Sequence, residues 1–134
     1  MLVYYKKNKS DIKVSYDTKQ SPLLDLTLND TKSELQIIGP KCKAKLNTGL
    51  NMYIPVGYIG LALFTHPKLY ASTSTVFVNS LDTNEISFEV QNISSDYVTV
   101  QNGDVIGQLL IVPYEQPVLK EVSETEWSTI SRGY

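Results

Sequence analysis

The side chains that could do chemistry in this sequence are mainly carboxylates. The 134 residues include 14 Asp and Glu, one His, one Cys and nine Tyr. Carboxylates activate water or hold a metal ion when several of them share one site. None of them stands in a local motif with a defined chemistry, and the sequence has no phosphate-binding glycine loop and no nucleophile elbow. The residue types alone therefore assign no reaction.

The single histidine and the single cysteine are weak candidates. His66 precedes Pro67 in a turn, and a lone turn histidine is more often structural or exposed than catalytic. Cys42 lies between two lysines that could make its thiol more reactive, but we interpret it as an ordinary strand residue. One Cys excludes an internal disulfide framework, and one His excludes a multi-histidine metal site within one chain.

The charge distribution indicates a globular protein without a nucleic-acid partner. The formal net charge is −2, with 42% hydrophobic and 19% charged residues. The basic residues are mostly lysines scattered through residues 1–45, which is typical of solvated strand faces.

No apolar stretch approaches the ~20 residues of a membrane span, and the N-terminus lacks the layout of a secretory signal. We therefore expect no membrane partner and an intracellular location, in a host cytoplasm or in a virion.

Short strands must position any site. Apolar residues alternate with polar ones at Leu50, Met52 and Ile54, and further short apolar runs lie at 2–5, 12–16, 23–28, 35–38, 58–64, 76–78, 86–90, 97–100 and 105–112. Turn formers separate these runs, and no stretch keeps a helical period over three turns. The pattern of about ten strands predicts an all-β sandwich, barrel or jelly roll in residues 1–118. Residues 119–134 are polar and predict a C-terminal arm, with Trp127 as its anchor on this subunit or a neighbour.

Several stretches resemble the trimeric dUTPase family. Residues 46–50 (LNTGL) and 54–60 (IPVGYIG) resemble a family "DTG" strand followed by an "IPxGYxG" turn at the same spacing. Residues 90–94 (VQNIS) resemble "LxNxS", and residues 102–111 (NGDVIGQLLI) resemble "GDRIAQLI". The resemblance covers nearly the whole chain in order. It implies a dUTPase-like jelly roll (a β-clip barrel) that forms a homotrimer, with sites between subunits.

Two site residues of that family have counterparts in the strands. Gln108 stands at the glutamine that helps to hold triphosphate in the family, although a buried, satisfied amide is the preferred interpretation. Asp25 stands at the aspartate of the family's first motif, but the glycines and the tyrosine before that aspartate are absent here.

The family's water-activating aspartate has no certain counterpart. Aligning Glu85 and Ile86 with the end of the family's "GVIDxDYxGE" places Asn79 at the base, and an amide cannot accept a proton from water. Slipping the alignment brings Asp82 to that position, but Glu85 and Ile86 then no longer match.

The phosphate-binding motifs are also altered. Residues 64–69 align with "PRSGLA", so that Thr65 and His66 replace its arginine and serine. Lys68 could supply the charge but not the bidentate fork of an arginine. Arg132 stands where the last motif begins, and Tyr134 is interpreted as a remnant of the aromatic residue that covers the uracil.

Because four of five motifs depart from the family, the sequence predicts a non-enzymatic, dUTPase-like interaction or structural protein. We expect a viral accessory or virion-associated homotrimer with an unidentified protein partner and with no cofactor or metal. One alternative is a divergent Mg²⁺-dependent dUTP pyrophosphatase, with Asp82 or Asp25 as the base and Gln108 and Lys68 on the phosphates. Another is a non-catalytic binder of nucleotide or sugar that uses tyrosine faces at the subunit clefts.

Overall fold

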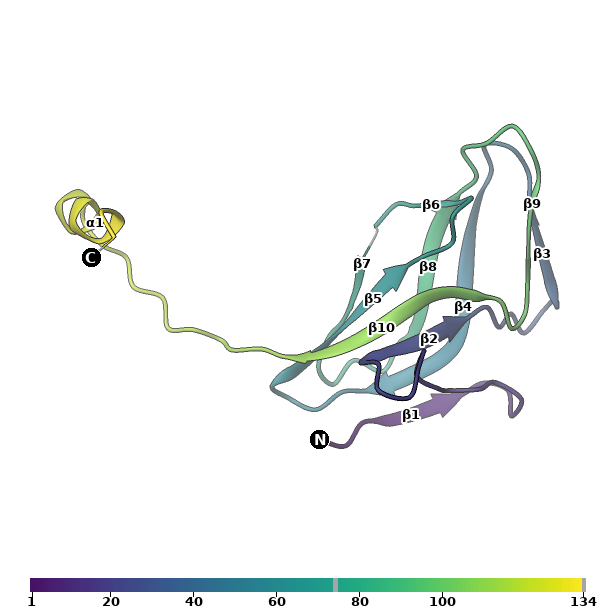
Figure 1. Ribbon diagram of the computed structural model, residues 1–134, viewed down its shortest axis with the longest axis horizontal. Coiled ribbons are helices and arrows are strands. Elements are labelled where there is room, and N and C mark those ends of the chain that lie inside the picture. Colours follow the sequence, from purple (N-terminus) through teal and green to yellow (C-terminus); the bar gives the residue numbers. More distant parts are fainter. Residues whose placement is uncertain (74, 134) are drawn as a thin grey trace.

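The computed structural model describes residues 1–73 and 75–133, in which strands dominate and one short helix follows them (Figure 1). The strands are β1 (Tyr4–Lys7), β2 (Leu23–Thr27), β3 (Leu35–Ile38), β4 (Lys43–Tyr53), β5 (Tyr58–Phe64), β6 (Tyr70–Ala71), β7 (Thr75–Val78), β8 (Glu85–Gln91), β9 (Val98–Gln101) and β10 (Val105–Pro113). The helix is α1 (Glu124–Ser131). The predicted all-β fold of about ten strands is confirmed.

Two four-stranded sheets enclose the core. Sheet I has the order β1-β4-β8-β6, sheet II has the order β2-β10-β5-β7, and β3 pairs with β9 beside them. All of these pairings are antiparallel. Alternate residues of both sheets face inward, as their period-two pattern predicts. The largest fully buried apolar side chains are Phe88, Leu26, Leu28, Leu46, Ile54, Ile106, Leu109 and Val100.

The stretch around Asn92 has a structural role. Asn92 is fully buried, and its Nδ2 donates to the carbonyl oxygens of Ile38 at 2.9 Å and Asp96 at 2.7 Å. Its Oδ1 accepts from the backbone N–H and the hydroxyl of Ser94. A buried amide with all of these partners satisfied holds the loop between β8 and β9 in place.

Local structure differs from the sequence prediction in three places. Residues 12–16 do not form a strand, since only Tyr16 makes an isolated bridge, to Leu24. Ile12 instead lies buried in the core from a loop, which accounts for the apolar run. Strand β6 and helix α1 were not predicted, because the first has two residues and the second lacks an apolar face that is buried.

Helix α1 does not pack against the body of its own chain. Ser123 caps it by accepting the backbone N–H of Glu126 at 3.2 Å, and Glu124 and Glu126 lie in its first turn. These are favourable placements for a helix start. No residue of α1 is buried, and Trp127 is 59% exposed. Trp127 is therefore not anchored on this subunit, contrary to one of the two expectations for it.

The segment before α1 runs away from both sheets (Figure 1). The backbone N–H of Tyr114 still donates to the Gly57 carbonyl at 2.9 Å. Beyond it Val118 is 97% exposed and Leu119 is 89% exposed. The division into residues 1–118 and an arm at 119–134 stays a prediction. Within the described residues, no helix has the length and apolar character to cross a membrane.

Candidate functional site

Two of the predicted site residues lie side by side on sheet II. Asp25 of β2 is directly opposite Gln108 of β10. The Nε2 of Gln108 donates to Oδ1 of Asp25 at 3.3 Å, and both side chains are half-buried. Paired side chains of antiparallel strands point to the same face of the sheet. The pair therefore presents a carboxylate and an amide together on the outer face of sheet II.

A β-bulge sets the direction of Gln108. The register between β10 and β2 shifts between Val105 and Gly107, and both Ile106 and Gly107 are buried. A Cβ at Gly107 would lie 2.5 Å from the carbonyl oxygen of Leu63, closer than side-chain atoms approach in proteins. Glycine at this position allows the strands to approach, and Gln108 then faces outward.

The outer face of sheet II around this pair is apolar. Its exposed or half-buried members are Leu23, Ile59, Leu61, Leu63, Phe77, Leu110 and Val112, of which Phe77 is 61% exposed. The outer face of sheet I is more polar, with Lys43, Lys45, Asn47, Ser87, Glu89 and Gln91 beside the exposed tyrosines Tyr4, Tyr53 and Tyr70. A contiguous apolar sheet face is typical of a surface that another protein chain covers.

Asp82 lies in the loop between β7 and β8. Its Oδ1 accepts the backbone N–H of Asn84 at 2.8 Å, and its own N–H donates to the Asn79 carbonyl at 3.1 Å. Leu81 has a φ of 63°, which makes the loop irregular, and its N–H donates to the Ile54 carbonyl at 3.0 Å. Asp82 is half-buried while Asn79 is exposed. Asp82 thus presents a fixed carboxylate with its Oδ1 already paired.

One chain does not bring Asp82 to the Asp25–Gln108 pair. The loop is tied to the beginning of β5, because the hydroxyl of Ser80 donates to the Tyr58 carbonyl at 2.6 Å. Gln108 is opposite Leu63, near the end of β5. At ~3.3 Å per residue, the five steps from Tyr58 to Leu63 separate the two places by about 17 Å. Within one chain, Asp82 and the Asp25–Gln108 pair are therefore separate.

Lys68 and His66 lie in the turn that follows β5. The turn starts beside β10, where the backbone N–H of Thr65 donates to the Ile106 carbonyl at 2.9 Å. The backbone N–H of Lys68 donates to Nδ1 of His66 at 3.3 Å. The imidazole stacks on Phe64, with ring centroids 6.4 Å apart and planes 29° apart.

The charge state of His66 depends on this turn. Burial of the ring lowers the pKa of His66, the Asp104 carboxylate opposes that change, and the nearby Lys68 ammonium reinforces it. A pKa below the ordinary range of histidine leaves the imidazole of His66 mostly neutral at pH 7.

The described residues of one chain offer a magnesium ion few carboxylate ligands. Among residues 1–73 and 75–133, no group of three or more His, Cys, Asp or Glu could hold a metal ion. Mg²⁺ commonly binds through one or two carboxylates together with substrate phosphates and water. The Asp25 carboxylate, half-buried beside an amide, fits that mode. Tyr134 lies outside the described residues.

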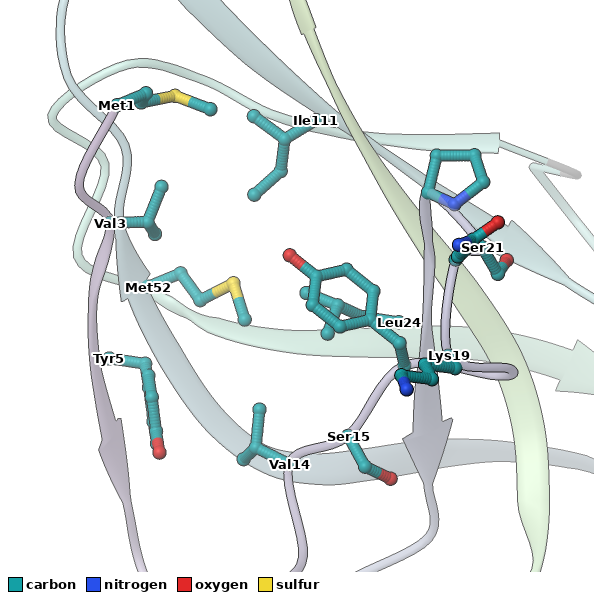
Figure 2. Close-up of a pocket in the computed structure, with 13 residues that line it drawn as sticks. Met1, Val3, Tyr5, Val14, Ser15, Lys19, Ser21, Leu24, Met52 and Ile111 are labelled. Carbon is teal, nitrogen blue, oxygen red and sulfur yellow. The ribbon is translucent and has the colours of Figure 1, made fainter.

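A separate cavity opens between the two sheets. It has a volume of about 700 Å³, and Val3, Leu24, Met52 and Ile111 face it from both sheets (Figure 2). Leu24 precedes Asp25 on β2, so the cavity and the Asp25–Gln108 pair lie on opposite faces of that strand. Of the four predicted site residues, none lines this cavity.

Comparison with known proteins gives consistent results. The family model for dUTPase matches residues 11–134. A deoxyuridine 5'-triphosphate nucleotidohydrolase from Ehrlichia canis is 29% identical over 126 residues, which is 89% of this chain and 80% of that protein. The enzyme of the same name from Syntrophotalea carbinolica is 29% identical over 104 residues, 72% of this chain and 69% of that protein.

Solved structures of phage dUTPases share the fold. The Staphylococcus bacteriophage 80alpha dUTPase superimposes with a TM-score of 0.76 at 18% identity, covering 92% of this chain and 97% of that one. A mutant dUTPase from phage phi11 of S. aureus, described with a structural Mg(II) ion, gives a TM-score of 0.77 at 18% identity and covers 92% of this chain and 98% of that one.

These comparisons overturn the expectation of a non-enzymatic interaction or structural protein. The curated relatives carry the name of an enzyme, and a neighbouring phage dUTPase was solved with dUpNHpp. The expectation relied on a fixed spacing across residues 79–86, where the structure has an irregular loop with a carboxylate at Asp82. With the dUTPase model matched over residues 11–134, the chain belongs to the dUTPase family.

Proposed function

We propose that this chain hydrolyses dUTP to dUMP and pyrophosphate with Mg²⁺. The observation that carries the proposal is the Asp25–Gln108 pair, in which two residues from distant segments meet at 3.3 Å. Both residues come from stretches that resemble motifs of the family. The enzyme name of the curated relatives supports the same reaction.

Each site residue has a role that its chemistry allows. Gln108 donates hydrogen bonds through Nε2 to the substrate phosphates, and Lys68 adds a positive charge beside them. Asp82 accepts a proton from the attacking water, since its carboxylate is fixed by the Asn84 N–H. The water oxygen forms a bond to the α-phosphorus, the bond from that phosphorus to the oxygen that bridges to the β-phosphate breaks, and pyrophosphate leaves with that oxygen.

Asp25 is the residue that would hold the metal ion. Mg²⁺, when bound, supplies positive charge that neutralises the phosphates and stabilises charge developing on the leaving pyrophosphate. Asp25 contributes one carboxylate, and the Gln108 amide keeps that carboxylate oriented.

The site is shared between copies of the chain. The Asp25–Gln108 pair lies on the apolar outer face of sheet II, so a second copy packed on that face reaches the pair. We propose that this copy contributes Asp82, which lies about 17 Å away within one chain. Closed three-fold association, which is typical of the family, would form three such sites.

The arm extends this association. Val118 and Leu119 are almost fully exposed in an extended segment that runs away from its own sheets. Their apolar side chains match the apolar floor of the cavity between the sheets (Figure 2). We propose that the arm of one copy covers this cavity on another, where Trp127 would also be protected from water.

The function is tested by pyrophosphate release from dUTP in the presence and absence of Mg²⁺. We expect turnover that stops when EDTA removes the metal ion and resumes when Mg²⁺ is added again. Unchanged turnover in EDTA would refute the role given to Asp25. An intracellular location is proposed with the reaction, because deoxynucleoside triphosphates are made inside cells. The viral origin and the further protein partner stay predictions.

A further inference from the structure

One dipeptide of the chain can modify itself. Asn102 precedes Gly103, and the sequence has no second Asn-Gly pair. The backbone nitrogen of such a glycine can attack the side-chain carbonyl carbon of the asparagine, because no Cβ hinders its approach. The nitrogen gives up its proton, ammonia leaves the side chain, and a cyclic imide forms. Water then opens the imide to aspartate or isoaspartate, so Asn102 is a candidate site of spontaneous deamidation.

The fold engages the side chain of Asn102 in three hydrogen bonds. Its Oδ1 accepts the backbone N–H of Asp30 at 2.9 Å. Its Nδ2 donates to the carbonyl oxygens of Asp30 at 3.2 Å and Ser33 at 3.3 Å. Loss of Nδ2 as ammonia breaks two of these bonds. The reaction therefore costs interactions that the closed structure supplies and an open one does not.

The attacking nitrogen is engaged by the same part of the chain. The backbone N–H of Gly103 donates to the carbonyl of the buried Leu28 at 2.8 Å, and the N–H of Asn102 donates to the Glu34 carbonyl at 2.9 Å. A proton shared in a hydrogen bond with a buried partner is harder to remove. Both reacting groups are thus held by residues 28–34, which join β2 to β3 and are called the 28–34 segment below.

Water and charge at this place favour the later steps but not a return to the closed state. Asn102 is half-buried and lines a polar hollow of about 380 Å³ together with Lys9, Asp11 and Glu34. Water that opens the imide can therefore reach it. A new carboxylate adds repulsion from the Asp11 and Glu34 carboxylates. The Lys9 ammonium, which donates to the Asp30 carbonyl at 2.9 Å, offsets part of that repulsion.

The product does not restore the contacts of Asn102. A carboxylate at this position still accepts the N–H of Asp30, but it has no proton to donate to the carbonyl oxygens of Asp30 and Ser33. Isoaspartate in addition lengthens the backbone by one carbon at a turn that the Asp104 N–H closes on the Gln101 carbonyl at 3.0 Å. Closure of the 28–34 segment is therefore weaker after the reaction than before it.

We propose that Asn102–Gly103 is a latent deamidation site that the closed 28–34 segment keeps unreactive, and that the reaction prevents the segment from closing again. The pair then acts as an irreversible switch. The segment begins at the end of the β2–β10 ladder, where the N–H of Leu28 donates to the Asp104 carbonyl at 2.9 Å. The switch needs no substrate, so it stands apart from the proposed hydrolysis.

The test compares the rate of deamidation at Asn102 in the folded chain and in the same chain in guanidinium chloride, both at pH 7.4. Peptide masses after digestion report the reaction at this residue. We expect the folded chain to react at least about tenfold more slowly, because it reacts only from the fraction in which the 28–34 segment is open. Equal rates in the two states would overturn the proposed protection.

Two glutamine variants show whether the segment provides the protection. The Nε2 of Gln36 donates to Oδ2 of Asp30 at 2.8 Å, so Gln36→Leu loosens the segment without removing a contact of Asn102. It should raise the rate in the folded chain about fivefold, the size expected for one lost hydrogen bond, and leave the rate in denaturant unchanged. Gln91→Leu is the matched control, because the Nε2 of Gln91 donates to the Lys41 carbonyl instead. Equal folded-state rates in both variants would contradict the role of the segment.

The switch itself is tested on chain that has reacted in denaturant, is separated from unreacted chain by ion exchange, and is then refolded beside it. The reacted chain should have a lower thermal midpoint and should lose hydrogen-exchange protection in residues 28–34. Complete failure of the reacted chain alone to refold would be the same loss in full. A reacted chain with the midpoint and the protection of the unreacted chain would overturn the switch.

Discussion

Replacing Asp82 with asparagine should remove the base and leave the fold intact. In Asp82→Asn the side-chain oxygen can still accept the backbone N–H of Asn84, which is 2.8 Å from the carboxylate in the structure. We therefore expect a stability change within about 0.5 kcal/mol, as for surface substitutions that keep their contacts. The amide cannot accept a proton from water, and positioned acid–base groups contribute about 10²- to 10⁴-fold to rate.

The expected loss is therefore about 10²- to 10⁴-fold in kcat, equivalent to about 3 to 5 kcal/mol in the barrier, with little change in KM. The assay is steady-state pyrophosphate release from dUTP, with thermal unfolding measured on the same preparations. Asn79→Asp is the matched control, because Asn79 is the rival position for the base in the same loop. Full activity of Asp82→Asn, or rescue of that variant by Asn79→Asp, would refute the assignment of Asp82.

The remaining predictions concern packing, assembly and the sharing of the site. Gly107→Ala should lower stability by about 1 to 3 kcal/mol in chemical denaturation, because its Cβ would lie 2.5 Å from a backbone oxygen; an unchanged midpoint would contradict the packing at the bulge. The wild type should sediment as an assembly of three 15.0-kDa chains. Leu61→Lys on the outer face of sheet II should dissociate this assembly to single chains, whereas the control Ser87→Lys on sheet I should not. Mixing and reassembling inactive Asp82→Asn and Gln108→Ala chains should restore part of the activity, and a mixture as inactive as its components would count against sites shared between copies.

Strands with one buried face could be predicted from the alternation of apolar and polar residues in the sequence. Alternation at residues 86–90 predicts β8, and its Ile86, Phe88 and Val90 are all buried. The run at 12–16 has similar composition but lies in a loop, because Ile12 enters the core without a strand partner. Apolar content alone does not distinguish these two cases, since pairing depends on residues distant in the sequence.

The sequence offered candidate site residues but not their arrangement. Asp25 and Gln108 were both candidates, and their contact depends on β2 pairing with β10 in a register that a bulge shifts. The choice between Asp82 and Asn79 stays a prediction, because the loop has a positive φ at Leu81 and spacing on either side of such a loop does not fix an alignment. The fixed orientation of His66 comes from the Lys68 N–H and the Phe64 ring, which a sequence pattern does not reveal.

The most direct test of the account is product analysis after the chain is incubated with Mg²⁺ and each deoxynucleoside triphosphate in turn. The account predicts dUMP and pyrophosphate in equal amounts from dUTP, at a kcat/KM at least about 100-fold above that for dCTP, dTTP, dATP and dGTP, because one hydrogen-bonding site discriminates strongly between substrates. No product from dUTP at high protein concentration, or equal hydrolysis of all five nucleotides, would contradict it.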